Sequence, residues 1–142
     1  MKIEKNSIKL KLISKLDYAF LYQLLKKRES NDNISHKKIP TYLDHVKFIK
    51  SKPYSKWYVV FFDKKKCGTI YITELNEIAF HLKKEYQDIE LQKVILKLIM
   101  EKNPTSRYLA NISPKNKNKI DFFKKNGFKI VQFTYELIQE HK

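Results

Sequence analysis

The sequence predicts a single α/β domain of the α+β type, with a central mixed, mostly antiparallel sheet flanked by four helices. Segments that alternate apolar and polar residues, as half-buried strands do, occur between segments whose apolar residues recur at helical spacing. The chain has 142 residues, the length of one ordinary domain, and 42% of them are hydrophobic, enough for one core. The expected order is β-α-α-β-β-β-α-β-α-β over residues 1–142, without an internal repeat.

The first three elements are a strand and two helices. Residues 8–14 alternate apolar and polar side chains and indicate a strand. Residues 15–29 carry apolar residues at helical spacing, and the polar stretch 30–38 follows as a loop. Pro40 suits the first position of a second helix, because its missing N–H breaks no hydrogen bond there, and Pro53 ends that helix. The apolar face of the second helix is expected to consist of Tyr42, Val46 and Ile49.

A hairpin and a short strand come next. Residues 56–63 are a dense run of β-prone side chains, 63–66 form a polar turn, and 67–73 resume the strand pattern. A further strand at residues 77–82 leads through residues 83–87 into a helix. The apolar stripe of this helix is Leu91, Val94, Ile95, Leu98 and Ile99.

The last part of the chain repeats this alternation. The third helix ends near Pro104, since the residue before a proline avoids the helical conformation. Residues 107–112 indicate a strand, and residues 114–126 indicate a helix. Gly127 is placed to cap that helix at its C-terminal end. Residues 130–138 are expected to be the closing strand.

The charge of the chain is strongly positive. Lys and Arg number 30 against 15 Asp and Glu, a net charge of +15, which raises the question of nucleic-acid binding. The lysines are spread along the whole chain, and the arginines are Arg28 and Arg107, whereas phosphate readers favour the bidentate fork of arginine. We therefore expect a solvated lysine-rich surface, with nucleic-acid binding as the weaker alternative.

The lengths of the apolar runs and the number of cysteines bear on the cellular compartment and on metal binding. No apolar run approaches the roughly 18 to 20 residues that span a bilayer, and the start of the chain lacks the apolar block of a signal peptide. The single cysteine, Cys67, forms no internal disulfide and no multi-cysteine metal site. We expect a cytoplasmic protein without a metal or a membrane partner, and a buried Cys67.

Residues 111–128 carry the clearest motif. In this segment Asn116 is followed by the aliphatic Ile120, by the aromatic pair Phe122-Phe123, and by Gly127-Phe128. Residues 114–126 of the segment are the expected helix. Such a helix buries Ile120 and Phe123 on a sheet, and Gly127 ends it in the left-handed conformation at little cost. The segment resembles one in the GNAT superfamily of N-acetyltransferases, and the expected element order resembles that fold over nearly the whole chain.

A second match is the strand at 76–82 with the turn and helix start at 83–92, preceded by Gly68 in the neighbouring strand. The resemblance implies a single GNAT-like domain in which the fourth and fifth strands splay apart to hold acetyl-CoA. Backbone N–H groups at the helix start would hold its pyrophosphate, as helix N-termini suit anions. The implied cofactor-binding residues are Phe80, Leu82, Gln87, Asp88, Ile89, Glu90, Leu91, Gln92, Asn111, Asn116 and Phe123.

Three residues depart from the family pattern. Aligned on Gln87, the chain has Glu90 and Gln92 where the family has glycine or a small residue. A carboxylate at position 90 would face the phosphates, and the alternative for this segment is an ordinary helix start whose Asp88 and Glu90 complement the helix dipole. Phe123 stands where many members have a tyrosine that protonates the leaving thiolate. Asn116 is either a helix N-cap or, as the resemblance implies, a contact to the pantetheine arm.

The resemblance implies acetyl transfer between the splayed strands. Backbone N–H groups near residues 80–82 would stabilise the oxyanion, and Glu77 and His81, on one face of that strand, are the candidate general bases. Asn111 and Ser113 offer polar contacts to substrate or pantetheine.

The expected function is transfer of an acetyl group from acetyl-CoA to an amine of a small molecule or a protein. The region from Ser35-His36 to Asp44-His45 resembles the histidine-rich second-helix region of similar short GNAT proteins, and this resemblance implies an amino sugar as the acceptor. The alternative is a catalytically degenerate GNAT-fold protein that serves as a binding or regulatory module. A homodimer is possible, by analogy with edge strands that pair between subunits in this fold.

Overall fold

The computed structural model describes residues 3–28 and 38–140. Short 3-10 turns lie at Lys5–Ser7, Lys15–Asp17 and Lys84–Tyr86. The strands and helices are β1 (Ile8–Leu12), α1 (Tyr18–Lys26), α2 (Tyr42–Lys50), β2 (Lys56–Phe62), β3 (Lys65–Ile72), β4 (Ile78–Leu82), α3 (Ile89–Lys102) and α4 (Lys117–Lys125). Most of the expected loop at 30–38, together with the expected end of the first helix and His36, lies outside the described residues.

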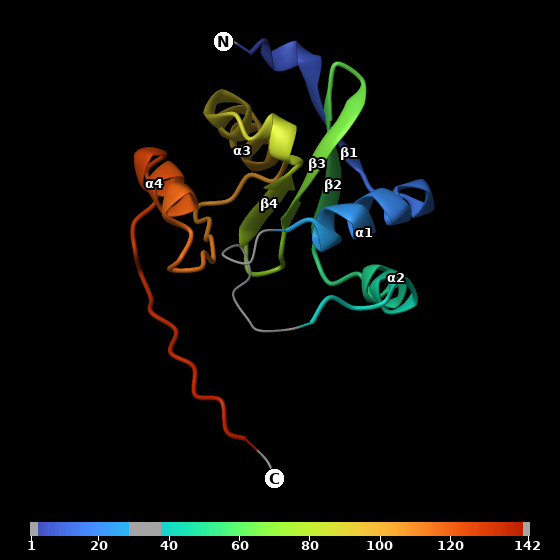
Figure 1. Cartoon of the computed structure of the whole chain (residues 1–142). Coiled ribbons are helices and arrows are strands. Elements are labelled where there is room, and N and C mark those ends of the chain that lie inside the picture. The colour runs from blue at the N-terminus through green and yellow to red at the C-terminus, as the bar shows by residue number, and fades with distance from the viewer. Residues whose placement is uncertain (1–2, 29–37, 141–142) are drawn as a thin grey trace.

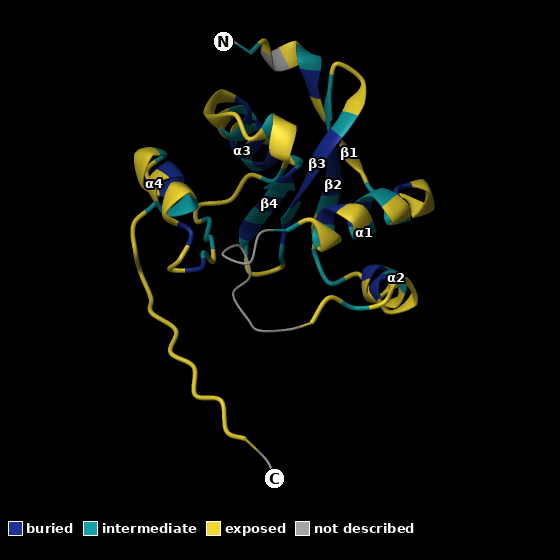
Figure 2. Cartoon of the chain, in the orientation of Figure 1, coloured by how far each residue is buried: buried dark blue, intermediate teal, exposed yellow. Residues whose placement is uncertain are grey.

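The four strands form one antiparallel sheet in the order β1-β2-β3-β4 (Figure 1). The hairpin between β2 and β3 confirms the one predicted from the sequence, with a register shift between Val60 and Phe61. Helices α3 and α4 lie on one side of the sheet and α1 and α2 on the other. Burial is concentrated on the strands and on the sheet-facing sides of the helices (Figure 2).

The alternation of side chains along β4 separates two environments. Ile78, Phe80 and Leu82 are buried in the main core with the inward residues of α3 and α4. Ala79 and His81 are partly buried on the opposite face, the one that α1 and α2 cover. β4 therefore presents an apolar face to one layer and a histidine to the other.

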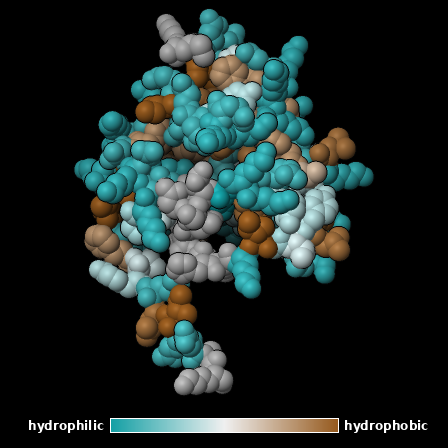
Figure 3. Space-filling view, viewed as in Figure 1, coloured by the Kyte–Doolittle hydropathy of each residue, from teal (hydrophilic) through white to brown (hydrophobic). Residues whose placement is uncertain are grey.

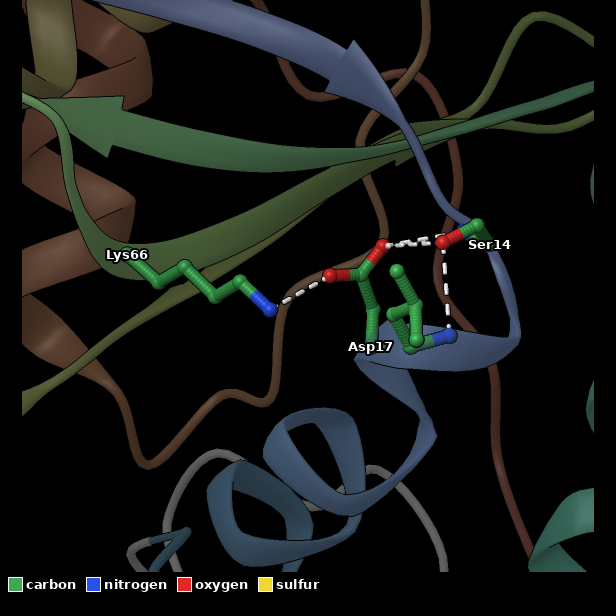
Figure 4. A network of polar contacts seen from close by, with 4 residues as sticks. Ser14, Asp17 and Lys66 are labelled. Carbon is green, nitrogen blue, oxygen red and sulfur yellow. Dashed lines mark hydrogen bonds and ion pairs between the residues drawn. The ribbon is translucent and has the colours of Figure 1, made fainter.

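A small polar network fixes the start of the first helical segment. The carboxylate of Asp17 accepts a hydrogen bond from the Ser14 backbone N–H at 2.8 Å and lies 2.7 Å from the Lys66 ammonium on β3 (Figure 4). Ser14 in turn caps this turn, so a capping box starts the helix. Asp17 is buried, and its pairing with Lys66 ties this helix start to the sheet.

Helix α4 ends as the sequence predicts. Gly127 has a φ of +92°, and its N–H and that of Phe128 donate to Lys124 and Phe123 carbonyls at 3.1 and 3.0 Å. This left-handed cap returns the chain so that Phe128 packs against the core. Cys67 is also buried, as expected, and burial raises the pKa of its thiol to about 11.

The second helix differs from the prediction in its start and in its buried face. Thr41, not Pro40, is the boundary residue, because its side chain accepts from the Asp44 N–H at 3.2 Å, and Pro40 lies before this cap. The buried residues of α2 are His45 and Ile49, whereas Tyr42 is exposed.

Two expected strands are not strands of the sheet. Residues 107–112 contact β4 through a single parallel bridge between Glu77 and Leu109. Residues 130–138 are extended but pair with no described strand, and the prediction of a closing strand was wrong for this chain. The alternation there is that of a strand, but a strand forms only where a neighbour offers its backbone groups. None of the described helices is long and apolar enough to cross a membrane.

Candidate active site

The free edge of β4 opens into a cavity. The Ile78 N–H donates to the Leu109 carbonyl at 2.8 Å, and the Leu109 N–H donates to the Asn76 carbonyl at 2.9 Å. Beyond this bridge the two chain segments separate, and residues 79–81 and 111–113 both line one cavity of about 670 Å³. The expected splay of the fourth and fifth strands is therefore present, with 107–112 as an extended segment rather than a regular strand.

Backbone groups of β4 face this gap. The Lys83 N–H donates to the Cys67 carbonyl of β3, and the Glu77 carbonyl accepts from the Thr73 N–H just after β3. By the alternation of an antiparallel pair, residues 78, 80 and 82 direct their backbone groups to the other edge of β4. The carbonyl of Phe80 accepts from the Lys119 ammonium at 2.8 Å, and the carbonyl of Leu82 accepts from the Gln87 side chain at 2.7 Å. The same alternation places the N–H groups of Phe80 and Leu82 on the gap side.

Lys119 lies across the gap. Its ammonium reaches from α4 to the Phe80 carbonyl and lies 4.9 Å from the centre of the Phe80 ring. Asn116, which precedes α4, accepts from the Lys119 N–H at 3.1 Å and also lines the cavity. Asn116 is therefore the helix N-cap, which is one of the two roles expected from the sequence.

Seven of the residues expected to contact substrate or cofactor line this cavity, as do Asp44 and His45 of the second helix. The seven are Glu77, Phe80, His81, Asn111, Ser113, Asn116 and Phe123. Leu82 and residues 87–92 are not among the described lining residues and lie instead at the approach to α3. The structure thus brings the expected acyl-transfer residues together and leaves the expected pyrophosphate residues apart from them.

The carboxylate of Glu77 is held by its neighbours. The Thr73 hydroxyl donates to one oxygen at 2.9 Å, and the Asn111 amide donates to the other. Both oxygens thus already accept hydrogen bonds, and the bond from Asn111 connects the residue before β4 to the segment across the gap. Of the two candidate bases, Glu77 is the one engaged in a structural network.

His81 lies on the cavity side of β4, opposite Thr69 of β3. Burial, and then the positive charges of Arg28 and Lys119, hold its pKa well below the ordinary value of 6.5. The imidazole is therefore neutral near pH 7 and has a lone pair that can accept a proton. A base of lowered pKa removes a proton less strongly but is never blocked by its own protonation at neutral pH.

The start of α3 is capped by a carboxylate. Asp88 accepts hydrogen bonds from the N–H groups of Glu90 and Leu91 at 2.8 and 3.1 Å. The Gln92 N–H donates to the Asp88 carbonyl. The amides that the resemblance assigns to a pyrophosphate thus already bind an anion supplied by the chain itself.

Phe123 belongs to an aromatic cluster. Its ring centre lies 6.0 Å from that of Phe80, 5.3 Å from that of Phe122 and 5.0 Å from that of Phe128. It fills the wall of the cavity with apolar surface and carries no proton to donate. The described residues hold no group of three or more His, Cys, Asp or Glu side chains that could bind a metal.

Apart from His45, sequence reasoning missed the far end of the cavity. Tyr54, Trp57 and Tyr71 form an aromatic wall there, in which the rings of Tyr54 and Tyr71 stack at 3.6 Å. Arg28, at the end of α1, and His45 of α2 also line it. The concentration of aromatic residues between 54 and 62 was the available signal, but it reads equally well as core packing.

No family model matches the chain, and neither does any curated protein. Solved structures do. An acetyltransferase from Thermus thermophilus has a TM-score of 0.72 at 16% identity, covering 93% of this chain and 92% of its own. A Salmonella typhimurium acetyltransferase that modifies the N-terminal serine of a ribosomal protein has a TM-score of 0.69 at 17% identity, covering 89% and 83%. An aminoglycoside acetyltransferase in complex with coenzyme A has a TM-score of 0.64 at 17% identity, covering 87% and 84%.

The chain has the GNAT fold. At these identities the similarity establishes the architecture, and the resemblance carried by the 111–128 segment is confirmed at that level. In a GNAT fold the gap between the fourth and fifth strands corresponds to the opening beyond Glu77 and Leu109 described above.

Proposed function

We propose that this GNAT-fold protein is an N-acetyltransferase that moves an acetyl group from acetyl-CoA to an amine. The observation that carries the proposal is the gap beyond the Glu77–Leu109 bridge, which opens into a cavity lined by both separating segments. A similar fold binds coenzyme A in the aminoglycoside acetyltransferase. A gap of this kind exposes unpaired backbone N–H donors in a partly apolar cavity. Such donors can polarise the carbonyl of a thioester that binds there.

The residues at the acyl end fit this chemistry. The gap-facing N–H groups of Phe80 and Leu82 can donate to the oxygen of the acetyl group as charge develops on it. Neutral His81 can accept the proton that the acceptor amine releases, directly or through a water. Acetyl-CoA supplies an activated acyl group with a thiol leaving group, which leaves near neutral pH with little assistance. The absence of a donor on Phe123 is thereby tolerated.

The residues at the diphosphate end fit less well. Asp88 caps the amides of Glu90 and Leu91, and Glu90 adds a second carboxylate there. Two like charges about 4 Å apart repel by about 4 kcal/mol at an effective dielectric near 20, before salt screening. We propose that acetyl-CoA is held mainly at its pantetheine and acyl end, with weakened affinity for the diphosphate. Lys119 would leave the Phe80 carbonyl to make room for the pantetheine.

Calorimetric titration with acetyl-CoA, followed by an assay of free thiol released in the presence of amines, tests the proposal. Saturable binding and amine-dependent thiol release are expected. His81→Asn should lower kcat by roughly 100-fold, as general bases contribute that much or more, and leave acetyl-CoA binding intact. Lys97→Ala, on the exposed face of α3, is the matched control. Absence of binding at millimolar acetyl-CoA would overturn the proposal.

We also propose that the protein is a homodimer in which the C-terminal segment of each copy covers the other. Residues 130–138 expose apolar side chains, among them Phe133, Tyr135 and Leu137. The segment leaves the body of the chain, and its apolar residues stand out in the space-filling view (Figure 3). Burying each such side chain is worth about 1.5 to 3 kcal/mol. Residues 107–112 form a sheet edge that makes a single bridge among the described residues. In the dimer, residues 130–138 of one copy would lie beside this edge of the other copy.

A further inference from the structure

Two buried polar atoms at the far end of the cavity lack hydrogen-bond partners. Arg28 Nε and His45 Nδ1 are both out of contact with solvent, and neither has a partner among the residues that the structure describes. Both residues line the cavity, Arg28 from the end of α1 and His45 from the inner side of α2. Buried polar atoms are nearly always satisfied, and leaving one unpaired costs about 1 to 3 kcal/mol, more when the group is charged.

The two groups are close enough to sense each other. The charge of Arg28 lowers the pKa of His45, after burial, and it also contributes to the lowered pKa of His81. The positive charge of Arg28 thus acts on both histidines. A neutral His45 keeps one N–H, and in the tautomer with the proton on Nδ1 the unpartnered atom is a hydrogen-bond donor.

No carboxylate among the described residues forms an ion pair with Arg28. Lys38 and Lys119 are further cations that line the cavity, and the carboxylates are Asp44 and Glu77. Glu77 is occupied by Thr73 and Asn111, and Asp44 is exposed at the first turn of α2. An anion is the ligand that satisfies the two unpaired donors, whereas a polycation would meet added repulsion.

We propose that Arg28 and His45 form a binding site for an anionic group, a carboxylate or a phosphate ester, carried by the acceptor of this acetyltransferase. This inference rests on the proposed function. The anion binds at the far end, the wall of Tyr54, Trp57 and Tyr71 packs against the body of the acceptor, and the amine extends to the gap beside Ala79 and His81. Tyr71 pairs with Ala79 across the sheet, so the wall and the gap are adjacent. The substrate class is therefore small amines that carry an acid, and polyamines are disfavoured.

Matched acceptors test the proposal. The carboxylate arm compares 4-aminobutyrate with butylamine and 1,4-diaminobutane, and the phosphate arm compares glucosamine 6-phosphate with glucosamine. In at least one arm the anionic acceptor should have a KM at least tenfold below that of its uncharged or cationic partner, and the arm that responds identifies the anion. Arg28→Gln should raise the KM of that acceptor at least tenfold, change kcat little, and leave the partner's KM unchanged. His45→Asn should act in the same direction with a smaller effect.

Controls separate this proposal from the acetyltransferase proposal. Arg107→Gln removes the other arginine, which is exposed, and should change nothing. Thermal unfolding of each variant checks the fold. If no acceptor is turned over, binding of 4-aminobutyrate and glucosamine 6-phosphate is followed by NMR titration without acetyl-CoA. Binding to the wild type that is lost in Arg28→Gln supports the anion site even then. Equal KM values within both arms, or equal binding to wild type and variant, would overturn it.

Discussion

Asp88 is the residue on which we expect cofactor affinity to depend most directly under the proposed function. Its carboxylate holds the first amides of α3, at the place where the GNAT resemblance puts a diphosphate. Asp88 stabilises the helix as its N-cap, but its negative charge repels an anionic ligand. The two roles can be separated because asparagine caps helices about as well as aspartate but carries no charge.

Asp88→Asn is therefore expected to tighten acetyl-CoA binding. Removing one charge from the diphosphate site should lower Kd roughly tenfold, equivalent to about 1.4 kcal/mol, at low salt. Calorimetry at two salt concentrations measures this effect, which should shrink as salt rises. Asp63→Asn, in the exposed turn between β2 and β3, is the control. An unchanged or weaker affinity in Asp88→Asn would place the diphosphate elsewhere.

His45 and His81 make the stability of the protein depend on pH. Burial, and then Arg28, with Lys119 also acting on His81, lower both pKa values in the folded state, whereas unfolded histidines titrate near 6.5. As the pH falls below about 6.5 the unfolded chain binds protons that the folded chain does not, so the free energy of unfolding decreases.

Urea unfolding at pH 7.5 and pH 5 measures this decrease. Carboxylates contribute to it as well, so the comparison is with a His45→Asn, His81→Asn double variant, which should lose less stability between the two pH values than the wild type. A loss as large in the double variant would contradict the pKa directions assigned to these histidines.

At the residue scale the sequence predicted the acyl end of the site better than the acceptor end. Glu77, His81 and Asn116 were found because a motif and strand alternation place them. Arg28 and His45 were missed as a pair because they come from two helices whose approach is set by tertiary packing. Neither helix carries a local signal that its polar side chains face one cavity.

Among the elements, the pairing of β3 with β4 depends on Gly68. A Cβ at this position would lie 2.5 Å from the His81 carbonyl oxygen and 2.9 Å from the Leu82 Cα. Both of these atoms are backbone atoms of β4, so the strand would have to move. Gly127 differs, since no atom lies within 4 Å and only its φ of +92° opposes a side chain.

Gly68→Ala is thus expected to destabilise the protein by about 1 to 3 kcal/mol and to weaken acetyl-CoA binding, because β4 carries the gap-facing donors. Gly127→Ala should cost about 1 to 2 kcal/mol through its backbone conformation alone and leave binding unchanged. Denaturant unfolding and calorimetry on both variants measure the difference. A Gly68→Ala variant with normal stability would show that β3 and β4 are less closely apposed than described.

Elements with local signals were predicted well, and those that depend on a neighbour were not. The hairpin, α3 and the Gly127 cap follow from β-prone runs, an apolar stripe and a left-handed glycine. Residues 107–112 and 130–138 have strand-like alternation, yet one forms a single bridge and the other none. Alternation predicts which face of a strand is buried but does not predict whether a partner strand is present.

For the whole molecule, the proposed dimer predicts a mass in solution of twice the 17.1 kDa of the chain. Phe133→Lys places a charge on the apolar face of the C-terminal segment and should shift the equilibrium to monomer. Thr134→Lys, on the opposite face of the same segment, is the control. Light scattering coupled to size exclusion measures both. A wild-type chain that is monomeric at high micromolar concentration would contradict the dimer.

We propose that the gap between β4 and residues 111–113 holds the acyl end of acetyl-CoA. Backbone amide NMR during titration with coenzyme A tests it most directly. The account predicts that the resonances of residues 79–82 and 111–116 shift most and follow one saturation curve, while those of β1 stay in place. Saturable shifts confined to other residues, or no shifts at millimolar coenzyme A, would contradict it.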